Sequence, residues 1–248
     1  RCTGYPPGIH VRMGDMSTKP AASSLNPEYA DIVDTPSLRE VTSREHKYCG
    51  HVLDVTVEKY LLSPHGPELT RDVVGMPGAV AVATLDEHDR ILLLNQYRHP
   101  VRMNLWEVPA GLLDIEGEDP LAAAQRELAE EADLEAKTWH TLIDYYTTPG
   151  GADEAGRIYL ARGLRRIPEG QSIPRGEEEA EITYRWVPLD AAVQLVLAGH
   201  IHNGLANQAI MAAYVASQVG FANLRSATDS WDFHPYLGGR RTRYRNVH

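Results

Sequence analysis

Alternating hydrophobic and polar positions predict a strand-rich first half of the chain. Four strands are expected, over residues 52–62, 69–74, 79–85 and 91–97. The first two are separated by a Pro- and Gly-containing turn at residues 64–67, and the last two by a polar turn at residues 86–89. The Met-Pro-Gly sequence at residues 76–78 breaks the pattern between the two pairs.

The second half of the chain adds helical periodicity. The strongest helix is predicted over residues 120–132, where Asp119 can cap the first turn and Pro120 takes the first helical position. Further strands are expected over residues 139–147, 157–161 and 182–187, and further helices over residues 190–198 and 205–219. This order predicts an α/β (α+β) fold, in which helices pack on a mixed sheet instead of forming a regular βαβ series.

The same patterns divide the chain into four segments. Residues 1–45 are expected to be a disordered or extended tail, residues 46–76 a small N-terminal β lobe, residues 77–225 the main domain and residues 226–248 a polar, solvated tail. Met13 or Met16 is a candidate natural start, with the residues before it an upstream extension.

Composition and charge narrow the class of protein. Of the 248 residues, 43 % are hydrophobic and 23 % charged, which is ordinary for a globular protein. The apolar stretches are far shorter than the ~20 residues of a membrane helix, so no membrane partner is expected. A net charge of −10 argues against nucleic acid as the main partner. Two cysteines, Cys2 and Cys49, cannot build a disulfide framework, and a cytoplasmic location is expected.

Acidic residues are concentrated around the strongest predicted helix. Residues 107–135 carry ten Asp or Glu residues and one basic residue, Arg126. At ~100° of rotation per residue, Glu127, Glu130 and Glu131 share one helix face, and Arg126 is expected to point away from Glu127. Clustered carboxylates without a basic partner favour a hard divalent cation such as Mg²⁺ or Mn²⁺. A solvated acidic helix face is the alternative for this segment taken alone.

The acidic segment as a whole resembles the signature of the Nudix hydrolases. That signature reads Gly, five residues, Glu, seven residues, then Arg-Glu-aliphatic-any-Glu-Glu-any-Gly-aliphatic. The stretch from Glu118 through Arg126 to Glu131 matches it at the required spacing. The chain departs from the signature at two places. Six residues, not five, separate Gly111 from Glu118. Asp133 replaces the final glycine of the signature, and that glycine ends the helix in a left-handed conformation.

Other stretches are similar to the ADP-ribose pyrophosphatase branch of that family. They are residues 71–73, 96–98, 106–111, 148–154 and 201–203. The resemblance implies a Nudix α/β/α sandwich with a mixed sheet, preceded by the small β lobe, through which two copies form a homodimer. It also implies metal-dependent hydrolysis of the pyrophosphate of ADP-ribose, a small-molecule nucleoside diphosphate sugar, to AMP and ribose 5-phosphate. The alternatives are a pyrophosphatase for another nucleotide sugar and a non-catalytic ADP-ribose sensor, although no matched carboxylate is lost.

The resemblance further implies roles for individual residues. The metal, Mg²⁺ with Mn²⁺ as a substitute, is expected on the carbonyl of Ala110 and the carboxylates of Glu127, Glu130 and Glu131. The catalytic residues are expected to be Glu131 and, as general base, Glu154. The substrate-binding residues are expected to be Arg71, Arg98, Glu107 and Leu112.

Several of these roles have competitors. Asp153 competes with Glu154 as the base, and the next candidates are Glu178, Glu179 and Glu181. Glu118 is expected to cap or support the helix more than to bind metal, and Arg126 to pair with a nearby acid. For Arg71, Arg98 and Glu107, an ordinary ion pair is the alternative to contact with substrate.

Overall fold

The computed structural model describes residues 27–168, 170 and 182–239, which fall into two compact units. The first unit comprises residues 27–77, Thr148–Glu154 and residues 231–239. The second comprises Gly78–Thr147 and Ala155–Ser230. The boundary after Pro77 lies one residue from the predicted start of the main domain.

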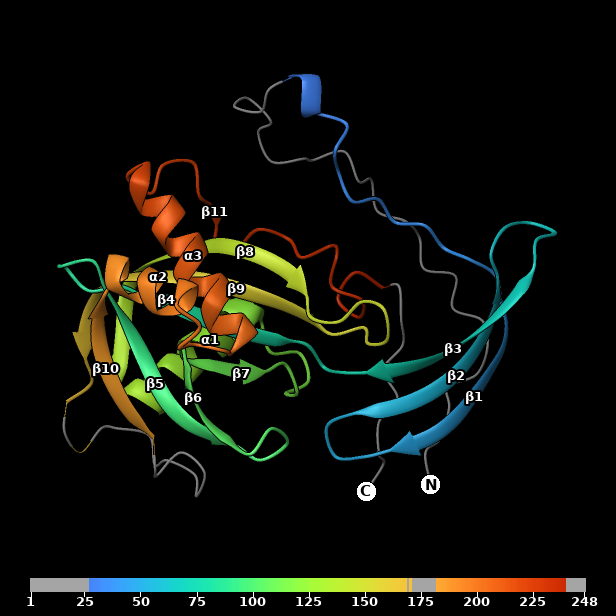
Figure 1. The fold of residues 1–248 in the computed structure, drawn as a ribbon, viewed down its shortest axis with the longest axis horizontal. Coiled ribbons are helices and arrows are strands. Elements are labelled where there is room, and N and C mark those ends of the chain that lie inside the picture. Colours follow the sequence, from blue (N-terminus) through green and yellow to red (C-terminus); the bar gives the residue numbers. More distant parts are fainter. Residues whose placement is uncertain (1–26, 169, 171–181, 240–248) are drawn as a thin grey trace. The chain divides into compact units, whose positions relative to one another are not determined.

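The first unit contains a three-stranded antiparallel sheet in the order β1-β2-β3 (Figure 1). A 3₁₀ turn, η1 (Pro27–Tyr29), precedes β1 (Val41–Cys49), β2 (Asp54–Leu61) and β3 (Glu68–Gly75). Strand β1 was not predicted, and it begins inside the expected tail of residues 1–45. Its side chains are almost all exposed, so the strand is held by backbone pairing with β2, which leaves no burial pattern in the sequence.

The second unit contains two sheets, in the orders β10-β5-β6 and β11-β8-β9-β4-β7. Their strands are β4 (Ala79–Thr84), β5 (Arg90–Arg98), β6 (Met103–Glu107), β7 (Ala110–Leu112), β8 (Leu134–Tyr146), β9 (Ala155–Arg166), β10 (Thr183–Pro188) and β11 (Arg225–Ser226). Strands β4 and β9 pair in parallel and the other pairs are antiparallel, which confirms the predicted mixed sheet. The short strands β6, β7 and β11 were not predicted.

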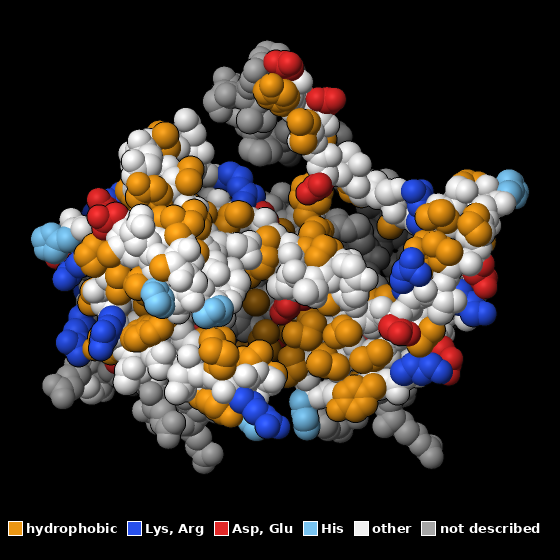
Figure 2. Space-filling view, in the orientation of Figure 1, with side chains coloured by type: hydrophobic (Ala, Val, Ile, Leu, Met, Phe, Trp, Pro, Cys, Tyr) orange, Lys and Arg blue, Asp and Glu red, His pale blue; other side chains and the backbone are white. Residues whose placement is uncertain are grey.

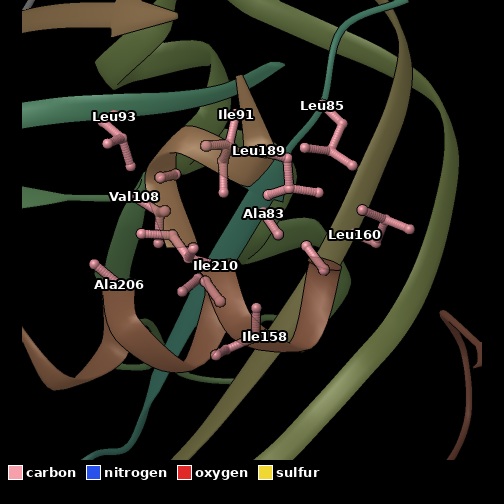
Figure 3. Close-up of a cluster of buried hydrophobic side chains, with 14 of the residues drawn as sticks. Ala83, Leu85, Ile91, Leu93, Val108, Ile158, Leu160, Leu189, Ala206 and Ile210 are labelled. Carbon is pink, nitrogen blue, oxygen red and sulfur yellow. The ribbon is translucent and has the colours of Figure 1, made fainter. Parts of the chain in front are cut away.

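The helices of the second unit cover both faces of its larger sheet. They are α1 (Pro120–Ala132), with the predicted bounds, α2 (Leu189–Leu197) and α3 (Gly204–Gln218). Figure 3 shows Ala83, Ile158 and Leu160 of the sheet packed with Ala206 and Ile210 of α3. Val80 and Val82 alternate with the β4 residues of this cluster and are buried on the opposite face, where α1 contacts β4. The resulting α/β/α layers confirm the expected fold class.

A buried arginine anchors the end of the second unit. The Arg157 guanidinium binds both carboxylate oxygens of Asp144 at 2.7 and 3.0 Å and donates to the carbonyls of Asp229 and Ser230 at 2.8 and 3.2 Å. Burial opposes its charge, but the contact with Asp144 outweighs burial and raises the pKa of Arg157. Burial also raises the pKa of the neighbouring Tyr159 phenol to about 12.

The first part of the predicted C-terminal tail, residues 226–239, is folded and partly buried in the structure. Ser226 belongs to β11, and its carbonyl accepts a hydrogen bond from the Thr141 hydroxyl at 2.9 Å. Trp231 and His234 are buried, so this stretch is not a solvated tail. Of the two predicted tails, residues 1–26 and 240–248 lie outside the described residues. In the described ranges no helix is long and apolar enough to span a membrane.

Candidate functional site

Helix α1 is fixed at both ends, which sets the direction of its acidic side chains. The Asp119 carboxylate accepts hydrogen bonds from the backbone N–H groups of Leu121 and Ala122 at 2.9 and 3.3 Å, as predicted for the N-cap. At the other end Asp133 adopts φ 53° and ψ 38°, the left-handed conformation that the helix terminus requires. Its N–H donates to the Ala129 carbonyl at 3.1 Å.

Two glutamates of α1 lie against the backbone of β7. The Ala110 N–H donates to Glu131 Oε2 at 3.0 Å. Beside it, a Cβ added to Gly111 would lie 1.9 Å from Glu127 Oε1, so only glycine leaves room for this carboxylate. Glu127 and Glu131 are 8 % and 5 % exposed. The strand β7 and the i, i+4 spacing on α1 thus bring two carboxylates together in a site largely closed to water.

The Arg126 side chain lies among the acidic residues of α1. It donates from Nε and Nη2 to both oxygens of Glu118 at 2.9 and 3.0 Å. Its Nη1 donates to Glu127 Oε1 at 2.7 Å and Glu130 Oε2 at 3.0 Å. The expectation that Arg126 points away from Glu127 was wrong, because the long side chain reaches acids on both sides of its own position. The expectation that it pairs with a nearby acid is confirmed.

These contacts shift the pKa values of Arg126 and Glu118. The hydrogen bonds that Arg126 donates to Glu118 favour the charged guanidinium and raise the pKa of Arg126. The same bonds favour the carboxylate and lower the pKa of Glu118. Glu118 therefore does not cap the helix, a position that Asp119 takes, but binds Arg126 in the position that contacts Glu127 and Glu130.

The donors around β7 and α1 suit a hard divalent cation. Three carboxylates, those of Glu118, Glu127 and Glu130, bind one guanidinium, and Glu131 adds a fourth carboxylate on the same helix. Negative charge is therefore in excess, and the available ligands are oxygen atoms. Within the described ranges no three His, Cys, Asp or Glu side chains are already grouped as a metal site. Arg126 binds one oxygen of each of two candidate ligands, Glu127 Oε1 and Glu130 Oε2.

Arg98 and Glu107 form an ion pair between β5 and β6. Arg98 Nε and Nη2 donate to the two carboxylate oxygens of Glu107 at 2.9 and 2.7 Å. Glu107 is 4 % exposed, whereas the Arg98 side chain is 41 % exposed. The pairing that the sequence left as an alternative is therefore present, and it holds an accessible guanidinium in one orientation. Leu112, the last residue of β7, is half-buried.

The remaining predicted site residues belong to the first unit. Arg71 lies on β3 with its side chain exposed, and its Nη1 donates to the Thr70 carbonyl at 2.8 Å. Glu154 is half-buried and ends the loop Thr148–Glu154. Asp153, its competitor, accepts hydrogen bonds at both carboxylate oxygens, from Met76 N–H and from the Tyr236 hydroxyl. Glu178, Glu179 and Glu181 lie outside the described residues.

Sequence reasoning missed one polar residue beside this loop. Tyr236 stands in a stretch without periodicity or a recognisable motif, so only the folded chain reveals its contact with Asp153. Trp106 of β6 is half-buried and packs against the main hydrophobic cluster.

Comparison with known proteins agrees with this geometry. Residues 75–207, more than half of the chain, match the family model of the NUDIX domain. The chain is 39 % identical over 198 residues to an ADP-ribose pyrophosphatase of Mycobacterium tuberculosis, an alignment that covers 79 % of this chain and 92 % of the relative. An ADP-ribose pyrophosphatase of Bacillus subtilis is 34 % identical over 175 residues, with 70 % and 92 % covered.

A solved structure extends the likeness to the fold. The crystal structure of an ADP compounds hydrolase superposes with a TM-score of 0.64 at 18 % sequence identity. The superposition covers 76 % of this chain and 98 % of that protein. The two proteins therefore share an arrangement of helices and strands although their sequences are only 18 % identical.

Proposed function

The chain belongs to the Nudix family, and from that premise we propose that it hydrolyses the pyrophosphate of ADP-ribose to AMP and ribose 5-phosphate. In this reaction a water oxygen forms a bond to one phosphorus while the bridging P–O bond breaks. The observation that carries the proposal is the similarity to the two ADP-ribose pyrophosphatases, which extends over 92 % of each. The acidic residues of the family signature, which are all present, support it.

Nudix hydrolases generally use divalent metal ions, and we propose Mg²⁺ here, with Mn²⁺ as a substitute. The ligands would be the Ala110 carbonyl and the carboxylates of Glu127, Glu130 and Glu131. A bound cation would neutralise phosphate oxygens and lower the pKa of an attacking water. Two features support this assignment: Glu127 and Glu131 are buried against β7, and carboxylates outnumber the one guanidinium near them.

The proton of the attacking water needs an acceptor, and we assign this role to Glu154. A carboxylate bound to metal is a weak base, whereas Glu154 lies on a loop away from α1 in the sequence. Arg71 and Arg98 are proposed to contact the diphosphate or the terminal sugar, since a guanidinium can bind two phosphate oxygens at once. Glu107 orients Arg98, and Leu112 at the end of β7 is proposed to line the substrate site.

The sheet β1-β2-β3 is the proposed site of homodimer formation. Hydrophobic side chains lie among charged ones at the surface over these strands (Figure 2). The exposed hydrophobic residues in the strands or next to them include Val41, Tyr48 and Leu62. The buried side chains of β2 are the polar Asp54, Thr56 and Glu58, so this sheet lacks the apolar face that an isolated sheet needs, and a second copy is the proposed cover for its exposed apolar residues. The proposed location is the cytoplasm, where the thiol of Cys49 would stay reduced.

A substrate panel tests the proposed function. Purified protein with Mg²⁺ would be given ADP-ribose, GDP-mannose, UDP-glucose, NAD⁺ and ATP, and the products separated by chromatography. We expect the highest kcat/KM for ADP-ribose, with AMP and ribose 5-phosphate as products, no turnover in EDTA, and recovery with Mg²⁺ or Mn²⁺. A higher kcat/KM for another nucleotide sugar would favour that substrate, and tight binding without turnover would favour a sensor.

A further inference from the structure

The segment of residues 231–239, expected to be a solvated tail, contacts the loop that carries Asp153 and Glu154. Both segments belong to the first unit, and Figure 1 shows the red segment beside the yellow loop that follows β8. The Tyr236 hydroxyl donates to Asp153 Oδ2 at 2.9 Å. The Met76 N–H donates to Asp153 Oδ1 at 2.9 Å. Each oxygen of this carboxylate is therefore bound by a different part of the unit.

The backbone of the loop is also attached to the end of β3. Val74 N–H donates to the Gly151 carbonyl at 2.8 Å, and Asp153 N–H donates to the Val74 carbonyl at 3.1 Å. Val74 and Ala152 form an isolated parallel bridge. The loop is thus docked along one strand up to Asp153, the residue before Glu154.

Tyr236 is itself held in place by a compact turn. His234 is 2 % exposed, and its Nδ1 accepts hydrogen bonds from the N–H groups of Tyr236 and Leu237, both at 3.2 Å. The buried Trp231 ring lies edge-on to His234, with centroids 4.7 Å apart. A Cβ on Gly238 would lie 2.1 Å from the Asp232 carbonyl oxygen, so the turn requires glycine there. Such a packed and hydrogen-bonded turn presents the Tyr236 hydroxyl in a defined position.

We propose that Tyr236 is a positioning residue for catalysis: by binding Asp153 it fixes the loop in the conformation in which Glu154 can take the proton of the attacking water. This inference rests on the proposed function and on the role of Glu154 in it. A hydroxyl–carboxylate hydrogen bond is among the stronger ones in proteins, and the displacement of a catalytic group by about 1 Å can lower the rate ~10²-fold. The family match ends at residue 207, so this contribution comes from outside it.

The test uses Tyr236→Phe in the full chain, which removes the hydroxyl and keeps the ring. With ADP-ribose and Mg²⁺ we expect kcat to fall about tenfold while KM changes by less than about twofold, because the loop and not the substrate is displaced. Tyr29→Phe is the matched control, since its hydroxyl belongs to an exposed side chain of η1, and it should leave both constants unchanged. Amide hydrogen exchange at Asp153 should be faster in Tyr236→Phe than in the control.

A double-mutant cycle separates positioning from general stabilisation. If Tyr236 acts through the base, adding Tyr236→Phe to Glu154→Gln should lower kcat no further. An equal loss in both backgrounds would show that the tyrosine only stabilises the fold, and wild-type kcat in Tyr236→Phe would likewise overturn the proposal. The assay of the wild-type protein separates the two proposals. If the wild type does not hydrolyse ADP-ribose, the proposed function and this role of Tyr236 are both overturned. If the wild type is active and Tyr236→Phe is equally active, the role of Tyr236 alone is overturned.

Discussion

Glu131 shows how a single residue can be tested for function without disturbing the fold. In Glu131→Gln the amide oxygen can still accept the Ala110 N–H, but the charge that a cation needs is gone. We expect kcat with Mg²⁺ to fall by orders of magnitude while circular dichroism and melting temperature stay near those of the wild type. Glu135→Gln is the matched control, because Glu135 pairs with Arg165 at the exposed surface. Near-normal turnover in Glu131→Gln would contradict the assignment of α1 as the metal site.

The second test at this scale decides between the neighbours Asp153 and Glu154. Removal of a general base typically lowers kcat by ~10²- to 10⁴-fold, and we expect Glu154→Gln to lose that much with little change in KM. Asp153→Asn should lose less, since its remaining oxygen can still accept the Met76 N–H. Steady-state kinetics with ADP-ribose measure both. If Asp153→Asn proved the more damaging variant, or Glu154→Gln stayed active, the base would be sought first among Glu178, Glu179 and Glu181.

At the scale of elements, the ion pairs of Arg126 attach α1 to the loop before it. The hydrogen bond from Arg126 lowers the pKa of Glu118 in the folded protein below the ordinary 4.5, so this pair stabilises the fold above that pH and loses its effect as the pH falls through the lowered pKa. Glu118→Gln should therefore reduce the free energy of unfolding by about 1–3 kcal/mol at pH 7. The difference from the wild type should shrink in acid below the ordinary pKa.

Urea unfolding in EDTA at neutral and acidic pH measures this difference without a contribution from bound metal. Glu87→Gln is the control, because Glu87 is exposed in the turn between β4 and β5 and lies 3.8 Å from His88 Nε2. A Glu118→Gln penalty that stayed constant with pH would mean that shape, not charge, explains the role of Glu118.

The elements with strong burial patterns were predictable from sequence, and the others were not. Helix α1 was predicted to the residue because Asp119, Pro120 and an apolar stripe mark it, and β4 and β5 were predicted because their side chains are buried. Strand β1 was missed because its side chains are exposed and only its backbone is paired. Short strands such as β7 contain too few residues to show a period.

The candidate site divides in the same way. Spacing along one helix correctly placed Glu127 and Glu131 on a common side, because local geometry decides it. The contact of Arg126 with Glu127 depends on the rotamer of a long side chain. The contact of Tyr236 with Asp153 joins segments that are 83 residues apart in the sequence. No local pattern in the sequence records such contacts, so they required the folded chain.

At the scale of the whole molecule, the side chains of the first unit indicate that the protein forms a homodimer. In β2 the buried side chains Asp54, Thr56 and Glu58 are polar, whereas Tyr48 and Leu62 are 58 % and 48 % exposed. An isolated sheet of this kind gains little from the hydrophobic effect, so a second copy should cover the exposed apolar residues. Sedimentation velocity should give a homodimer of about 55 kDa, twice the 27.5 kDa of one chain.

The combined substitution Tyr48→Asp and Leu62→Asp should shift this protein toward the monomer, because a dimer would then bury unpaired carboxylates. Leu197→Asp, at a hydrophobic residue of α2 that is 68 % exposed, is the matched control and should leave the dimer intact. If Arg71 of β3 serves the site of the other copy, kcat/KM for ADP-ribose should fall in proportion to the fraction of dimer and recover at higher protein concentration. A wild-type chain that sediments as a stable, fully active monomer at assay concentration would contradict both the dimer and this use of Arg71.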